Sequence, residues 1–134
     1  EIPLRLVGSE MCIRDRDFAD QTLITYPVPD DMLDLIRQVL RPAGVSVPRR
    51  TTELTVAILQ LVASGRGVAA LPLWAVKHYL DRGYVSQRSI TAQGLTSRLY
   101  AVWPAQATGR NHLEDFVRIV RETTFVSLPD IELL

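Results

Sequence analysis

The chain has 134 residues, 47% of them hydrophobic, and its 15 Lys and Arg residues are matched by 15 Asp and Glu. This length and composition indicate one globular domain and exclude a largely disordered chain. A net charge of zero argues against a nucleic-acid-binding surface, because phosphate contacts require an excess of basic residues. No apolar run reaches the roughly 20 residues of a membrane span. The sequence shows no secretory signal and only one cysteine, Cys12, so we expect a cytoplasmic protein without disulfides.

The first sixteen residues have an unusual sequence. Reverse translation of residues 6–16, LVGSEMCIRDR, gives the transposase adapter of a short-read sequencing kit, and residues 1–5 fit the primer bases before it. We interpret residues 1–16 as a non-native, adapter-derived segment and exclude them from the fold, so the native part is 17–134 and lacks its N-terminal region. The alternative is a natural strand with alternating apolar residues, Ile2, Leu4 and Leu6.

Residues 21–27, QTLITYP, are rich in β-branched and aromatic side chains and end at a proline, which predicts a buried strand. A turn follows, in which Asp30 can cap the next helix. The spacing of apolar residues predicts that helix over 31–40, and the sequence RPAG at 41–44 ends it. The apolar residues of this helix are Met32, Leu33, Ile36, Val39 and Leu40.

The next predicted unit is a strand, a helix and a second strand. Residues 45–49 form the first strand, and Thr51 or Thr52 is expected to cap an amphipathic helix. The apolar positions of this helix are Leu54, Ala57, Ile58, Leu61 and Val62. Gly65 lies where a C-cap glycine belongs. The wholly apolar run at 67–71, GVAAL, is typical of a strand inside a covered parallel sheet.

The remaining chain alternates in the same way. Pro72 ends that strand or opens a helix that Gly83 terminates. We predict strands over 84–90 and 95–102, then a last helix from Thr108 or Asn111. Its apolar face carries Leu113, Phe116, Val117 and Val120. The tail from 123 to 134 has no clear period.

This order of elements predicts an α/β domain with a mainly parallel sheet and helices on both faces. In such sheets, ligands bind beyond the carboxyl ends of the strands. Three strand-to-helix junctions lie there, at 26–28, 50–53 and 71–73. Each is expected to present unpaired backbone N–H groups, and converging helix N-termini favour a carboxylate or another anion.

The side chains at these junctions have two interpretations each. The hydroxyls of Thr51 and Thr52 can donate to a bound carboxylate or can simply cap the helix. Glu53 can hold a ligand ammonium group, or it can be a first-turn acid favoured by the helix dipole. Tyr26 can line the pocket or pack within the strand.

Neither a metal site nor a catalytic site is expected. The two histidines, His78 and His112, are far apart in the sequence, and no HExxH-type spacing or cysteine cluster is present. The segment 64–67, SGRG, lacks the spacing of a phosphate-binding loop and follows a helix. Since the sequence shows no nucleophile, base and orienting group together, we expect no enzymatic activity and no cofactor.

One long motif resembles a known family. Residues 59–76, LQLVASGRGVAALPLWAV, resemble the substrate-binding domain of LysR-type transcriptional regulators, in which a helix leads into a glycine-flanked apolar strand that closes with Leu-Pro. Four segments, one of them within this motif, are similar to the members that regulate methionine-pathway genes. These are LITYPV at 23–28, LRPAGVS at 40–46, GVAALPLWAV at 67–76 and GLTSRLYA at 94–101.

The resemblance implies a fold and a function. The expected fold is a two-lobed effector domain like a type 2 periplasmic binding protein, truncated at its N-terminus. The second lobe would span about 23–96, and 97–134 would form the end of the first lobe. A complete member would carry a winged helix-turn-helix, contact DNA only through it, form homodimers or tetramers and sense a small molecule. For the methionine regulators that effector is homocysteine.

The resemblance also implies where the effector binds. Effectors of this family lie between the lobes and contact the strand–helix junctions. The matching positions in this chain are Tyr26, Pro27, Val28, Thr51, Thr52, Glu53, Val68, Ala69, Leu71 and Pro72. The main alternative is a solute-binding protein of a transport system, which shares the fold. An enzyme lobe of the same architecture is the other alternative.

Overall fold

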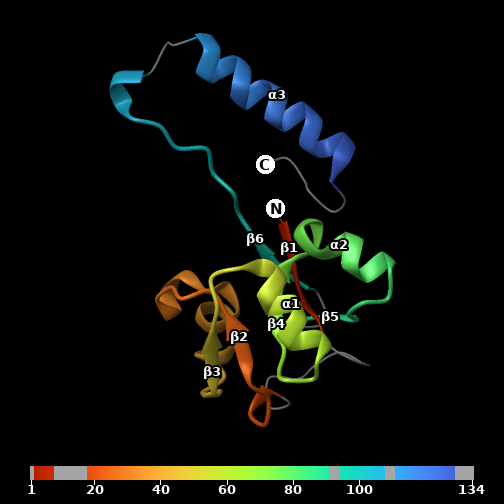
Figure 1. Ribbon diagram of the computed structural model, residues 1–134. Helices are drawn as coiled ribbons and strands as arrows, with labels where there is room; N and C mark the ends of the chain where they lie inside the picture. The colour runs from red at the N-terminus through yellow and green to blue at the C-terminus, as the bar shows by residue number, and fades with distance from the viewer. Residues whose placement is uncertain (1, 8–17, 91–93, 108–110, 129–134) are drawn as a thin grey trace.

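The computed structural model describes residues 2–7, 18–90, 94–107 and 111–128 (Figure 1). In chain order its elements are β1 (Ile2–Val7), β2 (Leu23–Thr25), η2 (Asp30–Met32), η3 (Ile36–Leu40), β3 (Arg49–Thr51), α1 (Thr55–Ala63), β4 (Ala69–Pro72), α2 (Leu73–Asp81), β5 (Gln87–Ser89), β6 (Leu95–Ser97), η4 (Ala105–Ala107) and α3 (Asn111–Ser127). The alternation of strands and helices confirms the predicted α/β class.

Three strands run parallel in the order β3, β2, β4. Strand β2 pairs with β3 in the register Leu23 to Arg49 and Thr25 to Thr51. On its other side, Leu23 forms a parallel bridge with Val68, where the Val68 carbonyl accepts from the Ile24 N–H at 2.8 Å. Each crossover between these strands contains a helix, as parallel connections require. The carboxyl ends of the three strands therefore lie at one edge.

Strand β1 is central to a second, four-stranded sheet, which contains β4 and meets the β2–β3 pair at the Leu23–Val68 bridge. It pairs antiparallel with β4, β5 and β6, so it is the shared neighbour of three strands. Residues 1–16 were predicted to lie outside the fold, whereas Ile2–Val7 form a strand in the structure. Pairing depends on backbone groups, which every residue except proline supplies in full, so it says nothing about the origin of the segment. The adapter interpretation therefore stays a prediction.

The sheet is covered on both faces. Neighbouring residues of a strand point to opposite faces, and in β2 Leu23 packs on one side while Ile24 packs on the other. The first face is covered by the η3 region, with buried Phe18, Leu35, Val39, Leu40, Val68, Ile90 and Leu95. The second is covered by α1 and α2, with buried Ile58, Leu59, Ala69, Leu71, Val76 and Val85. Each buried Leu or Ile contributes about 1.5–3 kcal/mol to folding.

Gly67 allows β4 to approach β2. It has a φ of 153°, and a Cβ at this position would lie 2.2 Å from the carbonyl oxygen of Thr22. The next residue, Val68, donates its N–H to that same Thr22 oxygen at 2.9 Å. A side chain at 67 would therefore separate the two central strands of the parallel sheet.

Several predicted boundaries were wrong, for local reasons. Asp30 is not a cap: η2 begins at Asp30 with Pro29 as its N-cap residue. The strand predicted over 45–49 lies at Arg49–Thr51, because the Thr52 N–H still donates to the Thr25 carbonyl at 3.0 Å. Helix α1 consequently begins only at Thr55, with Leu54 as an N-cap residue that makes no side-chain hydrogen bond. Neither Thr51 nor Thr52 caps it.

The helix predicted over 31–40 is present but irregular. After η2, the segment η3 is a π-helix, in which the Arg41 N–H donates to the Ile36 carbonyl at 2.9 Å. The Val45 N–H donates to the Leu40 carbonyl with the same spacing. These wide turns end at residues 41–44, where the sequence predicted a stop.

The C-terminal part, from residue 98, extends away from the sheets and the helices that cover them. After β6 the chain runs extended to η4 and then forms α3, which lies apart from the sheet (Figure 1). The strand predicted over 95–102 is therefore paired only at Leu95–Ser97, and α3 reaches Ser127, inside the tail for which no period was found. In the described parts of the chain, no helix has the length and apolar character needed to cross a membrane.

Candidate functional site

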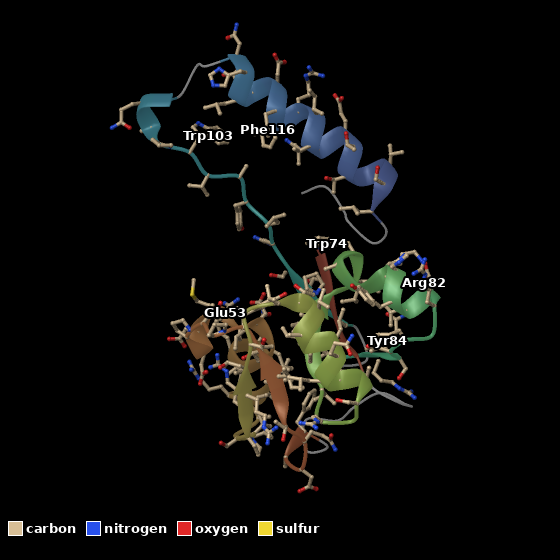
Figure 2. The ribbon with its side chains drawn as sticks, in the orientation of Figure 1. Glu53, Trp74, Arg82, Tyr84, Trp103 and Phe116 are labelled. Carbon is tan, nitrogen blue, oxygen red and sulfur yellow. The ribbon has the colours of Figure 1, made fainter. Side chains whose placement is uncertain are left out.

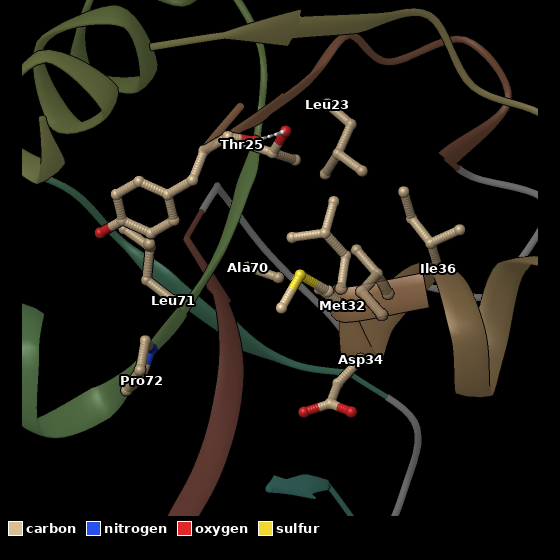
Figure 3. Close-up of a pocket in the computed structure, with 11 residues that line it drawn as sticks. Leu23, Thr25, Met32, Asp34, Ile36, Ala70, Leu71 and Pro72 are labelled. Carbon is tan, nitrogen blue, oxygen red and sulfur yellow. Dashed lines mark hydrogen bonds between the residues drawn. The ribbon is translucent and has the colours of Figure 1, made fainter. Parts of the chain in front are cut away.

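A cavity of about 160 Å³ lies at the carboxyl ends of β2 and β4, beside η2 and η3 (Figure 3). Its wall is mainly apolar, with polar groups from three residues. The lining residues are Leu23, Thr25, Tyr26, Met32, Leu33, Asp34, Leu35, Ile36, Ala70, Leu71 and Pro72. A mainly apolar hollow with a few polar groups, at the strand ends of an α/β sheet, is the usual character of a small-molecule site.

Three of the ten predicted site residues line this cavity. They are Tyr26, Leu71 and Pro72. Pro27 and Val28 follow Tyr26 directly in the loop between β2 and η2. Val68 and Ala69 lie elsewhere, because they are buried in the two core clusters on opposite faces of the sheet. The cavity thus joins the first and third of the predicted junctions.

The second junction lies beside this cavity without lining it. Thr51 ends β3, and Glu53 is exposed in the loop that leads to α1 (Figure 2). The link to the cavity comes instead from Thr55, the first residue of α1, whose Oγ1 lies 2.6 Å from the Tyr26 hydroxyl. This hydrogen bond holds the aromatic ring of the cavity wall against the start of α1.

Two helices begin at this edge without a side-chain cap. The N-cap residue of α1 is Leu54 and that of α2 is Pro72, and neither makes a capping hydrogen bond. The first N–H groups of an α-helix have no partner within the helix, and the helix dipole adds partial positive charge there. The uncapped N–H groups of these two helices can therefore bind a carboxylate or another anion at this edge, as the sequence predicted.

Asp34 is the charged residue of the cavity lining, and its carboxylate points away from the apolar side chains (Figure 3). Partial burial raises its pKa, but hydrogen bonds from Ser97, Arg37 and Gln38 and the charge of Arg37 outweigh this effect, so the pKa lies below its usual value of 3.8. The Ser97 hydroxyl donates to Oδ2 at 2.5 Å and the Gln38 amide to Oδ1 at 2.8 Å. Asp34 is therefore an ionised link between the cavity and the end of β6.

Arg49 determines the shape of the loop beside the cavity. Its guanidinium donates to the Thr25 hydroxyl at 2.7 Å and to the carbonyls of Tyr26 and Val28 at 2.9 and 2.6 Å. It also pairs with the Asp30 carboxylate at 2.5 Å. The Thr25 hydroxyl in turn donates to the Tyr26 carbonyl at 3.0 Å.

Sequence reasoning missed several lining residues and Arg49. Met32, Leu33 and Ile36 were assigned to a helix face, which the pattern indicates, but the pattern does not say what that face borders. Asp34 had no signal, because its partner Ser97 is 63 positions away. Arg49 ends the strand predicted over 45–49, and no local pattern indicates that its side chain holds a loop.

The histidines do not join the site. His78 is exposed on α2 with its ring edge-on to Tyr79, and His112 is exposed on α3. In the described parts of the chain, no three His, Cys, Asp or Glu residues lie together as a metal site would require. The cavity has instead the character of a site for a small organic molecule.

Sequence comparison places this architecture among known proteins. The LysR substrate binding domain matches residues 4–124, beginning within β1. The HTH-type transcriptional regulator MetR of Haemophilus influenzae is 51% identical over 118 residues, which are 88% of this chain and 38% of that protein. The chain therefore spans well under half the length of this relative.

Solved structures agree with the sequence comparison. The regulatory domain of MetR, a LysR family regulator from N. meningitidis, matches with a TM-score of 0.91 and 45% identity, covering 99% of this chain and 65% of that one. The ytmK protein of Bacillus subtilis, named as an amino-acid ABC transporter extracellular-binding protein, matches with a TM-score of 0.57 and 12% identity, covering 92% of this chain and 55% of that one. The second likeness concerns the fold alone, and it confirms the predicted resemblance to periplasmic binding proteins.

Proposed function

The chain belongs to the LysR substrate-binding domain family and is MetR-like, and from this we propose that it is the ligand-sensing part of a cytoplasmic transcriptional regulator of methionine biosynthesis genes. The proposed effector is homocysteine. DNA would be bound by a winged helix-turn-helix outside these 134 residues, and the complete protein would act as a homodimer or tetramer. Neither a catalytic step nor a resident cofactor enters this proposal.

The observation that carries the proposal is the cavity at the strand ends, bordered by the starts of two uncapped helices. Homocysteine has a carboxylate that suits helix N-termini. It also has a short apolar, sulfur-containing side chain that suits a wall of leucines, Ile36 and Met32. Its ammonium group would be met by Glu53 or by residues outside this chain. This chemistry requires no metal and no covalent bond.

The proposed mechanism is a shift between two arrangements of the lobes. An effector that binds better between closed lobes favours the closed arrangement by its difference in affinity. Closure would change how subunits pair on DNA and so change their affinity for it. The Asp34–Ser97 hydrogen bond is suited to this role, because it joins the cavity to the strand from which the chain leaves the lobe.

The full-length protein, expressed with its upstream sequence, tests the effector. A ligand that binds only the folded state at 100 times its Kd adds about 2.7 kcal/mol to the free energy of unfolding. We therefore expect homocysteine to raise the melting temperature by several degrees. The free amino acid alanine, added as a control ligand, should leave the melting temperature unchanged. The absence of any shift at high millimolar homocysteine would exclude it as the effector.

The upstream sequence itself tests the class of protein. We expect it to encode a winged helix-turn-helix. A signal peptide in its place would instead indicate an extracellular solute-binding protein.

A further inference from the structure

The loop between β2 and η2 has few backbone donors of its own. Two of its residues, Pro27 and Pro29, have no N–H to donate. The Val28 N–H is already used, because it donates to the Tyr26 carbonyl at 2.9 Å. The Tyr26 carbonyl accepts that bond and the Pro29 carbonyl accepts from the Met32 N–H at 3.0 Å, whereas the Val28 carbonyl depends on side-chain donors in the described part of the chain.

Arg49 supplies those donors from the neighbouring strand. Its Nη2 donates to two loop carbonyls, those of Tyr26 and Val28, while Nε donates to Thr25 Oγ1 and Nη1 to the Asp30 carboxylate. One planar side chain thus contacts both ends and the middle of the loop. A guanidinium has five N–H donors in a fixed fork, and a lysine ammonium cannot reproduce that geometry.

The ion pair alone does not explain this arrangement. The Asp30 side chain is 52% exposed, and ion pairs with such exposure contribute little to stability. The contacts with Thr25, Tyr26 and Val28 are partly buried. They are made to neutral groups whose positions define the loop, so their main effect is on conformation.

We propose that Arg49 is a positioning residue for effector binding. It does not line the cavity. It acts through the loop, because it holds the backbone of Tyr26 and Val28, while Thr55 holds the Tyr26 ring of the cavity wall. Without the guanidinium the loop samples other conformations, and only the fraction in the competent one binds effector. This inference rests on the proposed function, since it concerns affinity for an effector at this edge of the sheet.

The test compares Arg49→Lys and Arg49→Gln with Arg50→Gln in the full-length protein. Arg50 is the matched control, because it is the next residue of β3, is exposed and has a side chain with no hydrogen-bond partner among the described residues. Homocysteine affinity is measured by calorimetry, the melting temperature by circular dichroism and the exposure of the loop by amide hydrogen exchange at Val28.

We expect both Arg49 variants to raise the Kd for homocysteine about tenfold, equivalent to one or two lost hydrogen bonds. Amide exchange at Val28 should become faster, while the melting temperature of Arg49→Lys without ligand stays within a few degrees of wild type. Arg50→Gln should match wild type in all three measurements. A fall in melting temperature with unchanged affinity would show a purely structural role and overturn the proposal.

The effector assignment and the positioning role of Arg49 can be refuted independently. If the wild-type protein does not bind homocysteine, the proposed effector is wrong, while the exchange rate of the Val28 amide still decides whether Arg49 holds the loop. An unchanged exchange rate in Arg49→Lys overturns the positioning role whatever the effector.

Discussion

The part of the chain from 18 to 97 and the part from 98 to 128 show the same apolar periodicity with opposite outcomes. In the first part, α1 buries Ile58 and Leu59 completely, each with 0% exposure. In the second, α3 leaves Phe116 63% exposed, and none of the described side chains from 98 to 128 is buried. Trp103 and Phe116 stand away from the lobe (Figure 2). An apolar stripe thus predicts a helix, but its burial depends on a surface that covers it.

Local interactions maintain α3 without such a surface. Arg118 pairs with Asp115 at 3.0 Å and with Glu122 at 3.5 Å, at the spacings that stabilise an exposed helix. The chain spans 38% of the length of its H. influenzae relative. An exposed apolar face on α3 therefore agrees with the proposed two-lobed domain, in which residues outside this chain would cover it.

Truncation of one large side chain in each part gives the largest expected contrast. Ile58→Ala removes a fully buried side chain and should lower the free energy of unfolding by about 4 kcal/mol, because it leaves a cavity in the core. Phe116→Ala should change it by less than about 0.5 kcal/mol, as substitutions on an exposed surface do. Urea denaturation of the 134-residue chain, followed by tryptophan fluorescence, measures both.

A second buried and exposed pair serves as a control for residue type. Leu59→Ala should behave like Ile58→Ala, and Val120→Ala, at a position 43% exposed, should behave like Phe116→Ala. Equal losses for Ile58→Ala and Phe116→Ala would contradict the comparison, since α3 would then be packed as tightly as α1.

The approach of β4 to β2 gives the next largest effect. Gly67→Ala places a methyl group against the Thr22 carbonyl and should cost about 3 kcal/mol, because backbone strands cannot move apart without losing their hydrogen bonds. Gly44→Ala is the control for a positive φ without steric overlap: its φ of 67° also disfavours alanine, but a Cβ there would meet nothing within 4 Å. It should cost about 1 kcal/mol.

Melting curves of the two glycine variants separate steric overlap from backbone strain. Similar losses in both would show that the positive φ alone matters and that β2 and β4 can move apart. A clearly larger loss in Gly67→Ala than in Gly44→Ala is the expected result, and it would agree with strands β2 and β4 that cannot move apart.

Short-range signals explain what could be predicted from the sequence. The apolar run at 67–71 and Gly65 correctly indicated β4 and the end of α1, because strand burial and helix termination depend on neighbouring residues. The ends of β2 and β4 then placed Tyr26 and Pro72 at the cavity. Thr52 was misassigned as a cap because its N–H continues the pairing with β2, which no local pattern indicates.

Contacts between distant residues explain what could not be predicted. Asp34 and Ser97, and Arg49 with the loop after β2, are brought together only by the complete sheet. The sequence 95–102 predicted one strand, but strand formation requires a neighbour, and 98–102 has none among the described residues. Patterns therefore identify elements, whereas the site depends on how the elements meet.

The smallest expected effect lies where the two parts join, at the hydrogen bond from Ser97 to Asp34. The pKa of Asp34 is lowered in the folded chain, so the stability that it contributes is complete above its usual pKa of 3.8 and is lost as the pH falls through the lower, folded pKa. Asp34→Asn should therefore destabilise the chain at pH 6 by about 1 kcal/mol, the net value of one hydrogen bond, and by less at pH 3.

Asp31→Asn, which removes an exposed ion pair with Arg41, is the control for surface charge and should have little effect. Urea denaturation at both pH values decides the matter: an equal loss for Asp34→Asn at pH 6 and pH 3 would mean that the ionised carboxylate does not hold β6 to the cavity.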